Sequence, residues 1–332
     1  LPIYVSGVVF AAFAGRLPAA PDTSTLAWVT YGVMAVTTAI LLVGGTIERM
    51  LERAAWVMIT FIFLFLTLAN VIFVPFSHWV QTASGFVQFG HWPASVDMVL
   101  LATLAATAGS GGVGNIAISN WVRDKGYGMG ATTGAIPSAF GGRKIQLSAV
   151  GNVFDITPEN LRRWHLWCKY VYIDQVVLWA GGCFVGMFLN VNLATAIVPP
   201  GENLADVAAG AFQAKYMAEQ LWSGFWFLAL LNGFWILFST HLGNTDTLIR
   251  LVTDILWSAG ISRRANSNVG RLYYSLLAGF TVWGAITVQW GSAMTLFKVL
   301  GVVAGPVLAL GAVQLLIVNR SEERRVGKEC RS

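Results

Sequence analysis

The chain has 332 residues, of which 56% are hydrophobic and only 11% are charged, and its mean hydropathy is +0.64. Soluble domains carry about 25% charged residues, so this composition excludes a soluble globular domain and predicts an all-α integral membrane protein. The net charge of +5 would suggest a nucleic-acid partner for a soluble protein. Here the basic residues lie in loops between apolar segments, so we expect a lipid bilayer as the partner and no nucleic acid.

Apolar segments long enough to cross a bilayer as helices recur along the chain. Residues 1–15 are apolar but too short for a full span, so we interpret them as part of one. Seven complete spans follow, at 26–45, 54–74, 95–120, 170–198, 220–240, 272–290 and 294–318. The helical pattern of the span 220–240 continues to residue 257. Within the long polar stretch 121–168, Thr157 and Pro158 fit the start of a helix, with Thr157 as its N-terminal cap.

The basic residues fall almost entirely on one side of these spans. Twelve lie in alternate loops and the adjoining span ends, at Arg49, Arg53, Arg123, Lys125, Arg143, Lys144, Arg162, Arg163, Lys169, Arg263, Arg264 and Arg271. The opposite side has two, Arg16 and Lys215. Because cytoplasmic loops are enriched in Lys and Arg, the loops 46–53, 121–168 and 262–271 are predicted to be cytoplasmic.

The span 95–120 contains a cluster of small residues that sets it apart from the others. Gly109, Gly111, Gly112 and Gly114 occupy four of six positions, and Asn115 follows them. Glycine is about 1 kcal/mol less favourable than alanine in a helix interior, so the cluster favours a break in the helix. Irregular backbone inside a membrane is tolerated where it lines a cavity, and interrupted apolar helices mark the substrate sites of transporters.

Two other interpretations of this cluster stand beside the broken helix. Small residues in membrane helices often allow a neighbouring helix to pack closely. Residues 109–114 also match the dinucleotide-binding pattern G-x-G-x-x-G. That pattern requires a preceding strand and an acidic residue about 20 positions later, whereas apolar span residues precede it here and Asp124 comes too early. The sequence therefore favours a break or a packing surface over a nucleotide site.

The densest polar group in an apolar segment lies at 239–246. At helical spacing, Thr240, Asn244 and Thr247 share one side, with His241 beside them. This face either lines a cavity or forms hydrogen bonds between helices, and both interpretations remain open. A single histidine in such a place is more often a hydrogen-bonded interior residue than a ligand.

Charged residues continue the same helical pattern toward the cytoplasmic side. Asp246, Arg250 and Asp254 follow one another at intervals of four residues. Opposite charges at this spacing form ion pairs along a helix, so we interpret the three as a ladder at the cytoplasmic end of the helix.

Catalytic chemistry has no recognisable signature in the sequence. We find no pair of histidines with a carboxylate at metal-enzyme spacing, no nucleophile next to a base and no phosphate loop in context. We therefore expect no enzyme activity and no cofactor. Cys168, Cys183 and Cys330 are interpreted as small apolar residues, without a disulfide or a metal cluster.

The two ends of the chain differ from the rest. Leu1 and Pro2 begin inside an apolar run, and the sequence changes character abruptly after Asn319. Residues 320–332 resemble the conceptual translation of a sequencing adaptor. We expect 1–319 to form a partial transmembrane transporter domain and 320–332 to be a non-native tail. The alternative for 320–332 is a natural basic cytoplasmic tail.

The string at 109–130, Gly-Ser-Gly-Gly-Val-Gly-Asn-Ile-Ala-Ile-Ser-Asn-Trp-Val-Arg-Asp-Lys-Gly-Tyr-Gly-Met-Gly, resembles the sixth span and following loop of distant Nramp-related transporters. These natural resistance-associated macrophage proteins move divalent metals with protons. Residues 46–53 resemble the family's link between the fourth and fifth spans, 237–260 its eighth span, and the last two spans its ninth and tenth. The resemblance implies a LeuT-like fold of two inverted repeats with ions bound between two broken helices.

The same alignment implies an N-terminally truncated chain and an altered ion site. The first-span Asp-Pro-Gly-Asn motif of the family does not occur in this sequence. Where typical members have Met-Pro-His in the sixth span, this chain has Gly112, Val113 and Gly114, followed by Asn115. A soft thioether is therefore replaced by carbonyl and carboxamide oxygens, which suit harder ions such as magnesium or manganese.

The leading functional hypothesis is a secondary transporter that moves a divalent metal cation inward with protons, in a bacterial inner membrane. The expected metal ligands are Gly111, Gly112 and Asn115, and Gly109 and Ser110 complete the binding segment. The cytoplasmic half of the path is expected along Thr240, His241 and Asn244. Two alternatives remain, a LeuT-like transporter of an organic solute such as an amino acid and a membrane scaffold subunit that transports nothing.

Overall fold

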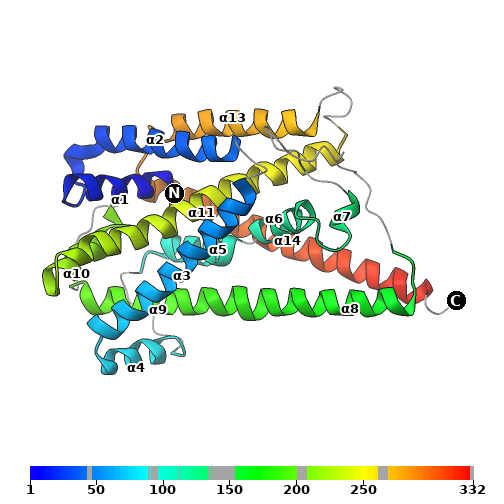
Figure 1. Cartoon of the computed structure of the whole chain (residues 1–332), viewed down its shortest axis with the longest axis horizontal. Coiled ribbons are helices and arrows are strands. Elements are labelled where there is room, and N and C mark those ends of the chain that lie inside the picture. The colour runs from blue at the N-terminus through cyan, green and yellow to red at the C-terminus, as the bar shows by residue number, and fades with distance from the viewer. Residues whose placement is uncertain are drawn as a thin grey trace.

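The computed structural model describes residues 1–42, 47–88, 90, 96–111, 113–133, 136, 154–199, 208–260 and 268–329. Within these residues every regular element is a helix and none is a strand, as the sequence predicted. Several of the long helices run roughly along the long axis of the molecule (Figure 1). The elements are α1 (Pro2–Ala14), η1 (Ala20–Asp22), α2 (Thr23–Leu42), α3 (Ile47–Phe73), α4 (Phe76–Gly85), α5 (Met98–Gly111), α6 (Val113–Asp124), α7 (Gly130–Thr133), α8 (Pro158–Tyr172), the π-helical η2 (Ile173–Ala180), α9 (Gly181–Ile197), α10 (Phe212–Gln220), α11 (Gly224–Ser258), α13 (Val269–Thr287) and α14 (Ala293–Glu329).

Five helical segments of the described residues are long and apolar enough to cross a bilayer. They are Ala20–Leu42, Ala55–Phe73, Pro158–Ile197, Phe225–Ser258 and Ala293–Ile317. Shorter apolar helices lie at Pro2–Ala14 and Met98–Thr107. The chain is therefore a multi-pass membrane protein of helices, because segments of this length and hydropathy are stable in lipid only as spans.

Two of the seven sequence-predicted spans are not among these five segments. The segment expected at 95–120 corresponds to α5 and α6, and the one expected at 272–290 corresponds to α13. The expected helix start at Thr157 is confirmed, since the Thr157 hydroxyl accepts a hydrogen bond from the Asn160 backbone N–H at 3.2 Å. The helix expected to run on to residue 257 is also confirmed, because α11 ends at Ser258. The backbone of α14 stays helical through Glu329, beyond the boundary expected at Asn319.

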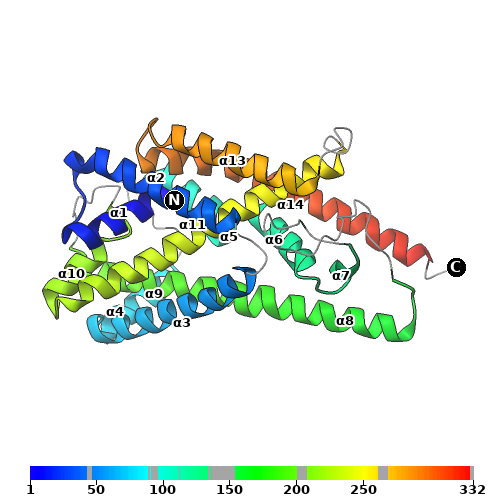
Figure 2. The same ribbon diagram turned by 45° about the horizontal axis from the view of Figure 1, so that its top comes forward.

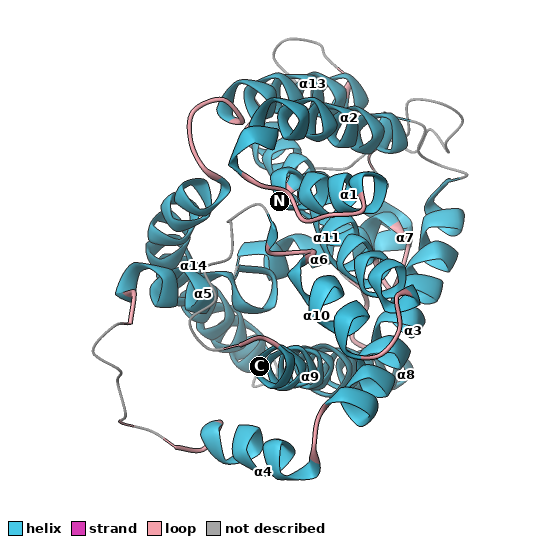
Figure 3. Ribbon diagram, turned by 90° about the vertical axis from the view of Figure 1, so that its left-hand side faces the viewer, coloured by secondary structure: helices cyan, strands magenta, loops and turns pink. Residues whose placement is uncertain are grey.

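Helix α11 lies at the centre of the bundle and contacts α1, α3, α6, α10 and α13 (Figure 2). Viewed end-on, α1, α6 and α10 lie around it (Figure 3). Its length of 35 residues lets it cross the whole packed region. Apolar side chains such as Leu230, Phe238 and Ile249 are buried at successive levels along it. This helix therefore positions most of the polar groups considered below.

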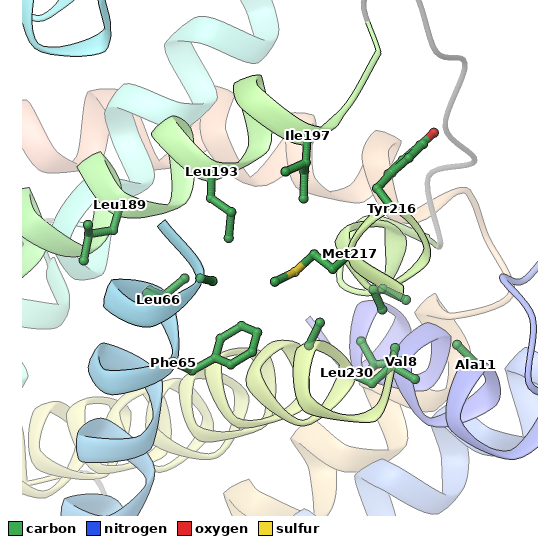
Figure 4. Packing of buried hydrophobic residues seen from close by; sticks show 14 of the residues in the cluster. Val8, Ala11, Phe65, Leu66, Leu189, Leu193, Ile197, Tyr216, Met217 and Leu230 are labelled. Atoms are coloured by element: carbon green, nitrogen blue, oxygen red, sulfur yellow. The ribbon is translucent and has the colours of Figure 1, made fainter. Parts of the chain in front are cut away.

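The largest hydrophobic cluster joins α1, α3, α9, α10 and α11 (Figure 4). Leu66, Leu193 and Met217 are completely or almost completely buried in it. Its labelled members are Val8, Ala11, Phe65, Leu66, Leu189, Leu193, Ile197, Tyr216, Met217 and Leu230.

Two buried asparagines join α3 to α9. The Asn70 amide donates hydrogen bonds to the Leu66 carbonyl at 2.8 Å and to the Leu189 carbonyl at 3.0 Å. The Asn192 amide donates to the Asn70 side-chain oxygen at 2.9 Å. Both asparagines are fully buried, so these bonds fix the rotation and height of α9 against α3.

Helices α5 and α14 approach each other through small residues. A Cβ atom on Gly301 of α14 would lie only 2.3–2.4 Å from Thr103 atoms of α5, including its Cα atom. One turn later, a Cβ atom on Gly305 would lie at an ordinary 3.9 Å from the Ala106 Cβ atom. Gly301 therefore sets the distance between these two helices.

We predict that Gly301→Val separates α5 from α14 and lowers the thermal stability of the detergent-solubilised protein. Overpacking of this kind typically costs about 1–3 kcal/mol, because backbone must shift to make room. The matched control is Gly311→Val on the same helix, where no atom lies within 4 Å of an added Cβ. Equal melting temperatures for the two variants would contradict the close contact.

Candidate functional site

The glycine cluster of the sequence lies where α5 and α6 adjoin. Gly109, Ser110 and Gly111 form the last residues of α5, and their backbone is helical. Gly112 lies outside the described residues, and α6 begins at Val113. Asn115 belongs to the first turn of α6, and its side chain lies outside the described part. The helical residues on both sides thus limit any break to a shorter stretch than the 109–115 expected from the sequence.

The opposite end of α6 is closed by a Schellman motif. Gly126 has φ of +77°, and its N–H donates to the Arg123 carbonyl at 2.8 Å. The Tyr127 N–H donates to the Val122 carbonyl at 3.2 Å. Glycine adopts this left-handed conformation without steric cost, so the turn ends α6 at Asp124. The glycine-rich loop string therefore places Arg123 and Asp124 in the last turn of a helix.

Charged side chains join this last turn to α11. The Asp124 carboxylate lies between two guanidinium groups, 2.9 Å from Arg123 Nε and 2.5 Å from Arg250 Nη1. Arg250 Nε also contacts Asp246 at 2.8 Å. Arg123 Nη1 reaches Asp254 at 2.8 Å. These five residues form one continuous network between the two helices, which we call the α6–α11 charge network.

Two neutral donors complete the contacts of Asp246. The indole N–H of Trp121 on α6 donates to Asp246 Oδ2 at 2.8 Å. The Tyr273 hydroxyl on α13 donates to Asp246 Oδ1 at 2.5 Å. The Arg250 guanidinium lies 5.7 Å from the Tyr273 ring centre, in cation–π distance. Three helices, α6, α11 and α13, therefore meet at one carboxylate.

The α6–α11 charge network is well shielded from solvent. The Asp124 side chain is 5% exposed and the Arg250 side chain 14% exposed. Burial raises the pKa of the Asp124 carboxyl, and the neighbouring Arg250 and Arg123 charges act against that shift and favour the ionised form. An uncompensated charge in such a place is strongly unfavourable, so the carboxylates and guanidinium groups depend on one another.

Sequence reasoning found part of this network. The expected Asp246–Arg250 ion pair along α11 is confirmed. Asp254, expected to extend the ladder along the same helix, forms its ion pair with Arg123 of α6 instead. Asp124 and Tyr273 did not stand out in the sequence, because no periodicity within one segment shows which distant helix lies opposite. The one available signal was that both residues lie in or next to loops that the distribution of Lys and Arg predicts to be cytoplasmic.

The residues expected along the transport path on α11 differ in their exposure. Thr240 and Asn244 are exposed, and the Thr240 hydroxyl donates to the Ile236 carbonyl of its own helix at 2.6 Å. His241 is 8% exposed, and its Nε2 has no hydrogen-bond partner among the described residues. The structure therefore does not place these three side chains on one surface.

The described part of the chain offers neither a cluster of metal-binding side chains nor a pocket at the residues expected from the sequence. No group of three or more His, Cys, Asp or Glu side chains there is arranged to hold a metal ion. An open depression of about 480 Å³ lies at the ends of α1 and α10 and the start of α11. None of the site residues expected from the sequence lines it; its lining residues are Gly15, Arg16, Leu17, Lys215, Ala218, Glu219 and Trp226.

We predict that Asp246→Asn destabilises the protein by about 3 kcal/mol, since it removes one charge from a buried pair while keeping a side-chain acceptor. Unfolding of the purified protein, followed by tryptophan fluorescence, measures this loss. The control is Glu159→Gln, which neutralises the exposed Glu159–Arg163 pair of α8 and should change stability by less than about 1 kcal/mol. Similar effects of both variants would contradict a structural role for the buried network.

We also predict that Gly126→Ala costs about 1–2 kcal/mol, because an alanine at φ of +77° places its Cβ against the backbone. Gly32→Ala is the control, since that glycine is helical and an added Cβ would meet no atom within 4 Å. The control should be neutral or stabilising in the same unfolding measurement. A neutral Gly126→Ala would show that the Schellman turn does not hold the end of α6.

Comparisons with known proteins do not assign this chain to a family. No family model, curated protein or solved structure matches it. What the described residues establish is an all-helical, multi-pass membrane protein whose central helix is joined to α6 by a buried charge network and to α13 by a hydrogen bond.

Proposed function

We propose that this chain is a secondary transporter that moves a divalent metal cation across the membrane together with protons, in the manner of Nramp-related proteins. The observation that carries the proposal is the glycine-rich meeting point of α5 and α6, within a bundle that has five candidate membrane spans. Such a junction in an apolar segment is the common position of a transporter's ion site.

Oxygen ligands suited to a cation are present at this junction. The last carbonyl groups of a helix have no partner within that helix, and the helix dipole is negative there. Gly109, Ser110 and Gly111 occupy this position in α5, and Asn115 adds a carboxamide from the start of α6. These are hard oxygen donors, which suit magnesium or manganese better than softer metals. With Gly112 between the helices, they are the ligands that we propose.

The α6–α11 charge network supports a mechanical role for the same junction. Helix α6 has 12 residues and begins at Val113, next to the junction. Asp124 and Arg123 hold its far end against α11. A hinge at glycine between one anchored helix and its neighbour permits α5 to move relative to α6. In this proposal, ion binding at the junction and the movement that releases the ion use the same glycines.

The site that we propose is smaller than the one expected from the sequence. Because Thr240 and Asn244 lie on the exposed side of α11, we do not include them among the ion-contacting residues. His241 lies beside them on the helix but is buried, so among these three residues we propose a role in the proton path for His241 only.

The test is uptake of manganese into proteoliposomes that contain the purified full chain. We predict that Asn115→Ala and Gly112→Leu each reduce uptake by about tenfold, which corresponds to about 1.4 kcal/mol of lost stabilisation. Gly311→Leu is the matched control, because an added Cβ there meets no atom within 4 Å.

Each other outcome of this assay overturns the proposal in a specific way. Unchanged uptake in both variants would remove the ion site from the junction. Transport that amino acids inhibit and metals do not would indicate an organic solute as the substrate. Absence of any flux from the wild-type protein would favour a scaffold subunit, in which the glycines serve helix packing.

A further inference from the structure

The open depression at the ends of α1 and α10 and the start of α11 is not explained by the features described so far. These elements meet at the end of the molecule opposite to α7 and the C-terminus (Figure 1). The volume of the depression, about 480 Å³, falls within the range of about 300–1,000 Å³ that is usual for small-ligand sites. None of its lining residues belongs to the glycine-rich junction or to the α6–α11 charge network.

Both basic residues of the predicted non-cytoplasmic side, Arg16 and Lys215, line this depression. The Arg16 guanidinium is already neutralised, because it donates two hydrogen bonds of 2.7 Å to the Asp22 carboxylate. The Lys215 ammonium lies 5.3 Å from the ring centre of Tyr216 and forms no ion pair with a described residue. Glu219, one turn further along α10, likewise has no cationic partner among the described residues. The depression therefore presents one positive and one negative charge, each without an opposite charge, on the same side of α10.

The indole of Trp226 adds a polar group to the lining of the depression. Its Nε1–H is buried and has no hydrogen-bond partner among the described residues. A buried donor without a partner costs about 1–3 kcal/mol, and such groups are rare in folded proteins. An acceptor oxygen held in the depression is the kind of partner that this donor lacks. Together with Lys215 and Glu219, it indicates a ligand that carries an anionic oxygen group and a cationic group close together.

The ends of two apolar helices place the depression at the level of the membrane–water interface. Gly15, with φ of +67°, directly follows α1, and Trp226 is the second residue of the candidate span Phe225–Ser258. Trp222 lies just before the same span. Tryptophan is enriched where membrane helices meet the lipid headgroups, which agrees with this level. The zwitterion that a depression at this depth meets is the headgroup of a phospholipid.

We propose that this depression binds the headgroup of a phospholipid that has a primary amine, as in phosphatidylethanolamine. Lys215 contacts the phosphate, and Glu219 accepts hydrogen bonds from the ammonium group. A choline headgroup has no N–H to donate to Glu219, and an anionic glycerol headgroup offers it no cation. The site therefore distinguishes headgroups by their chemistry. This inference goes beyond the proposed transport function and is independent of what the chain transports.

Native mass spectrometry of the full chain in detergent tests the proposal, with phosphatidylethanolamine, phosphatidylcholine and phosphatidylglycerol of identical acyl chains as probes. We expect one phosphatidylethanolamine to bind about tenfold more tightly than either other lipid, the effect of one charge-assisted hydrogen bond. Glu219→Gln should remove the preference over phosphatidylcholine, whereas Lys215→Ala should weaken both lipids, since both carry the phosphate. The matched controls are Glu159→Gln and Lys169→Ala, exposed residues of α8 that should leave binding unchanged.

Soluble phosphoethanolamine separates a lipid from a free zwitterion of the same chemistry. It lacks acyl chains, so we expect that it does not displace bound phosphatidylethanolamine at millimolar concentration; displacement would overturn the assignment to a lipid. Equal or tighter binding of phosphatidylglycerol would overturn the zwitterionic headgroup. A preference for phosphatidylethanolamine that persists in Glu219→Gln would place the lipid outside the depression. Neither Lys215 nor Glu219 is a buried side chain, so both variants are expected to fold as the wild type does.

Discussion

The carboxylate of Asp124 between the guanidinium groups of Arg123 and Arg250 is the contact on which the arrangement of the central helices depends. A buried charge is costly unless an opposite charge lies against it, so each member of the network holds its partners in place. Asp246 extends the constraint to α13 through the Tyr273 hydroxyl. Because lipid tails are as apolar as leucine, contacts of this kind determine which helices associate in a membrane.

Elsewhere in the bundle, the same requirement is met without charges. Asn70 and Asn192 join α3 and α9 by amide hydrogen bonds in a fully buried position. Gly301 brings α14 against Thr103 of α5 by the absence of a side chain. Amides and a small residue thus join α3 to α9 and α5 to α14, whereas buried charges join α6 to α11.

The glycine-rich junction and the charge network belong to the same short helix, α6. One end of this helix follows Gly112, and the other end is closed by the turn at Gly126 and held by Asp124. A helix that is fixed at one end and preceded by glycine at the other is suited to act as the stationary side of a hinge.

The sequence alone determined the membrane character, most helix positions, the start of α8 at Thr157 and the Asp246–Arg250 pair, because apolar length, helix capping and i,i+4 spacing are properties of one segment. Only the tertiary structure decided that Asp254 pairs with Arg123, that Tyr273 donates to Asp246, and that Thr240 and Asn244 are exposed while His241 is buried. Periodicity establishes which residues share a side of a helix. The neighbours that this side meets depend on how each helix is rotated against the others, which is set by contacts between different helices, such as Arg123 with Asp254 and Tyr273 with Asp246.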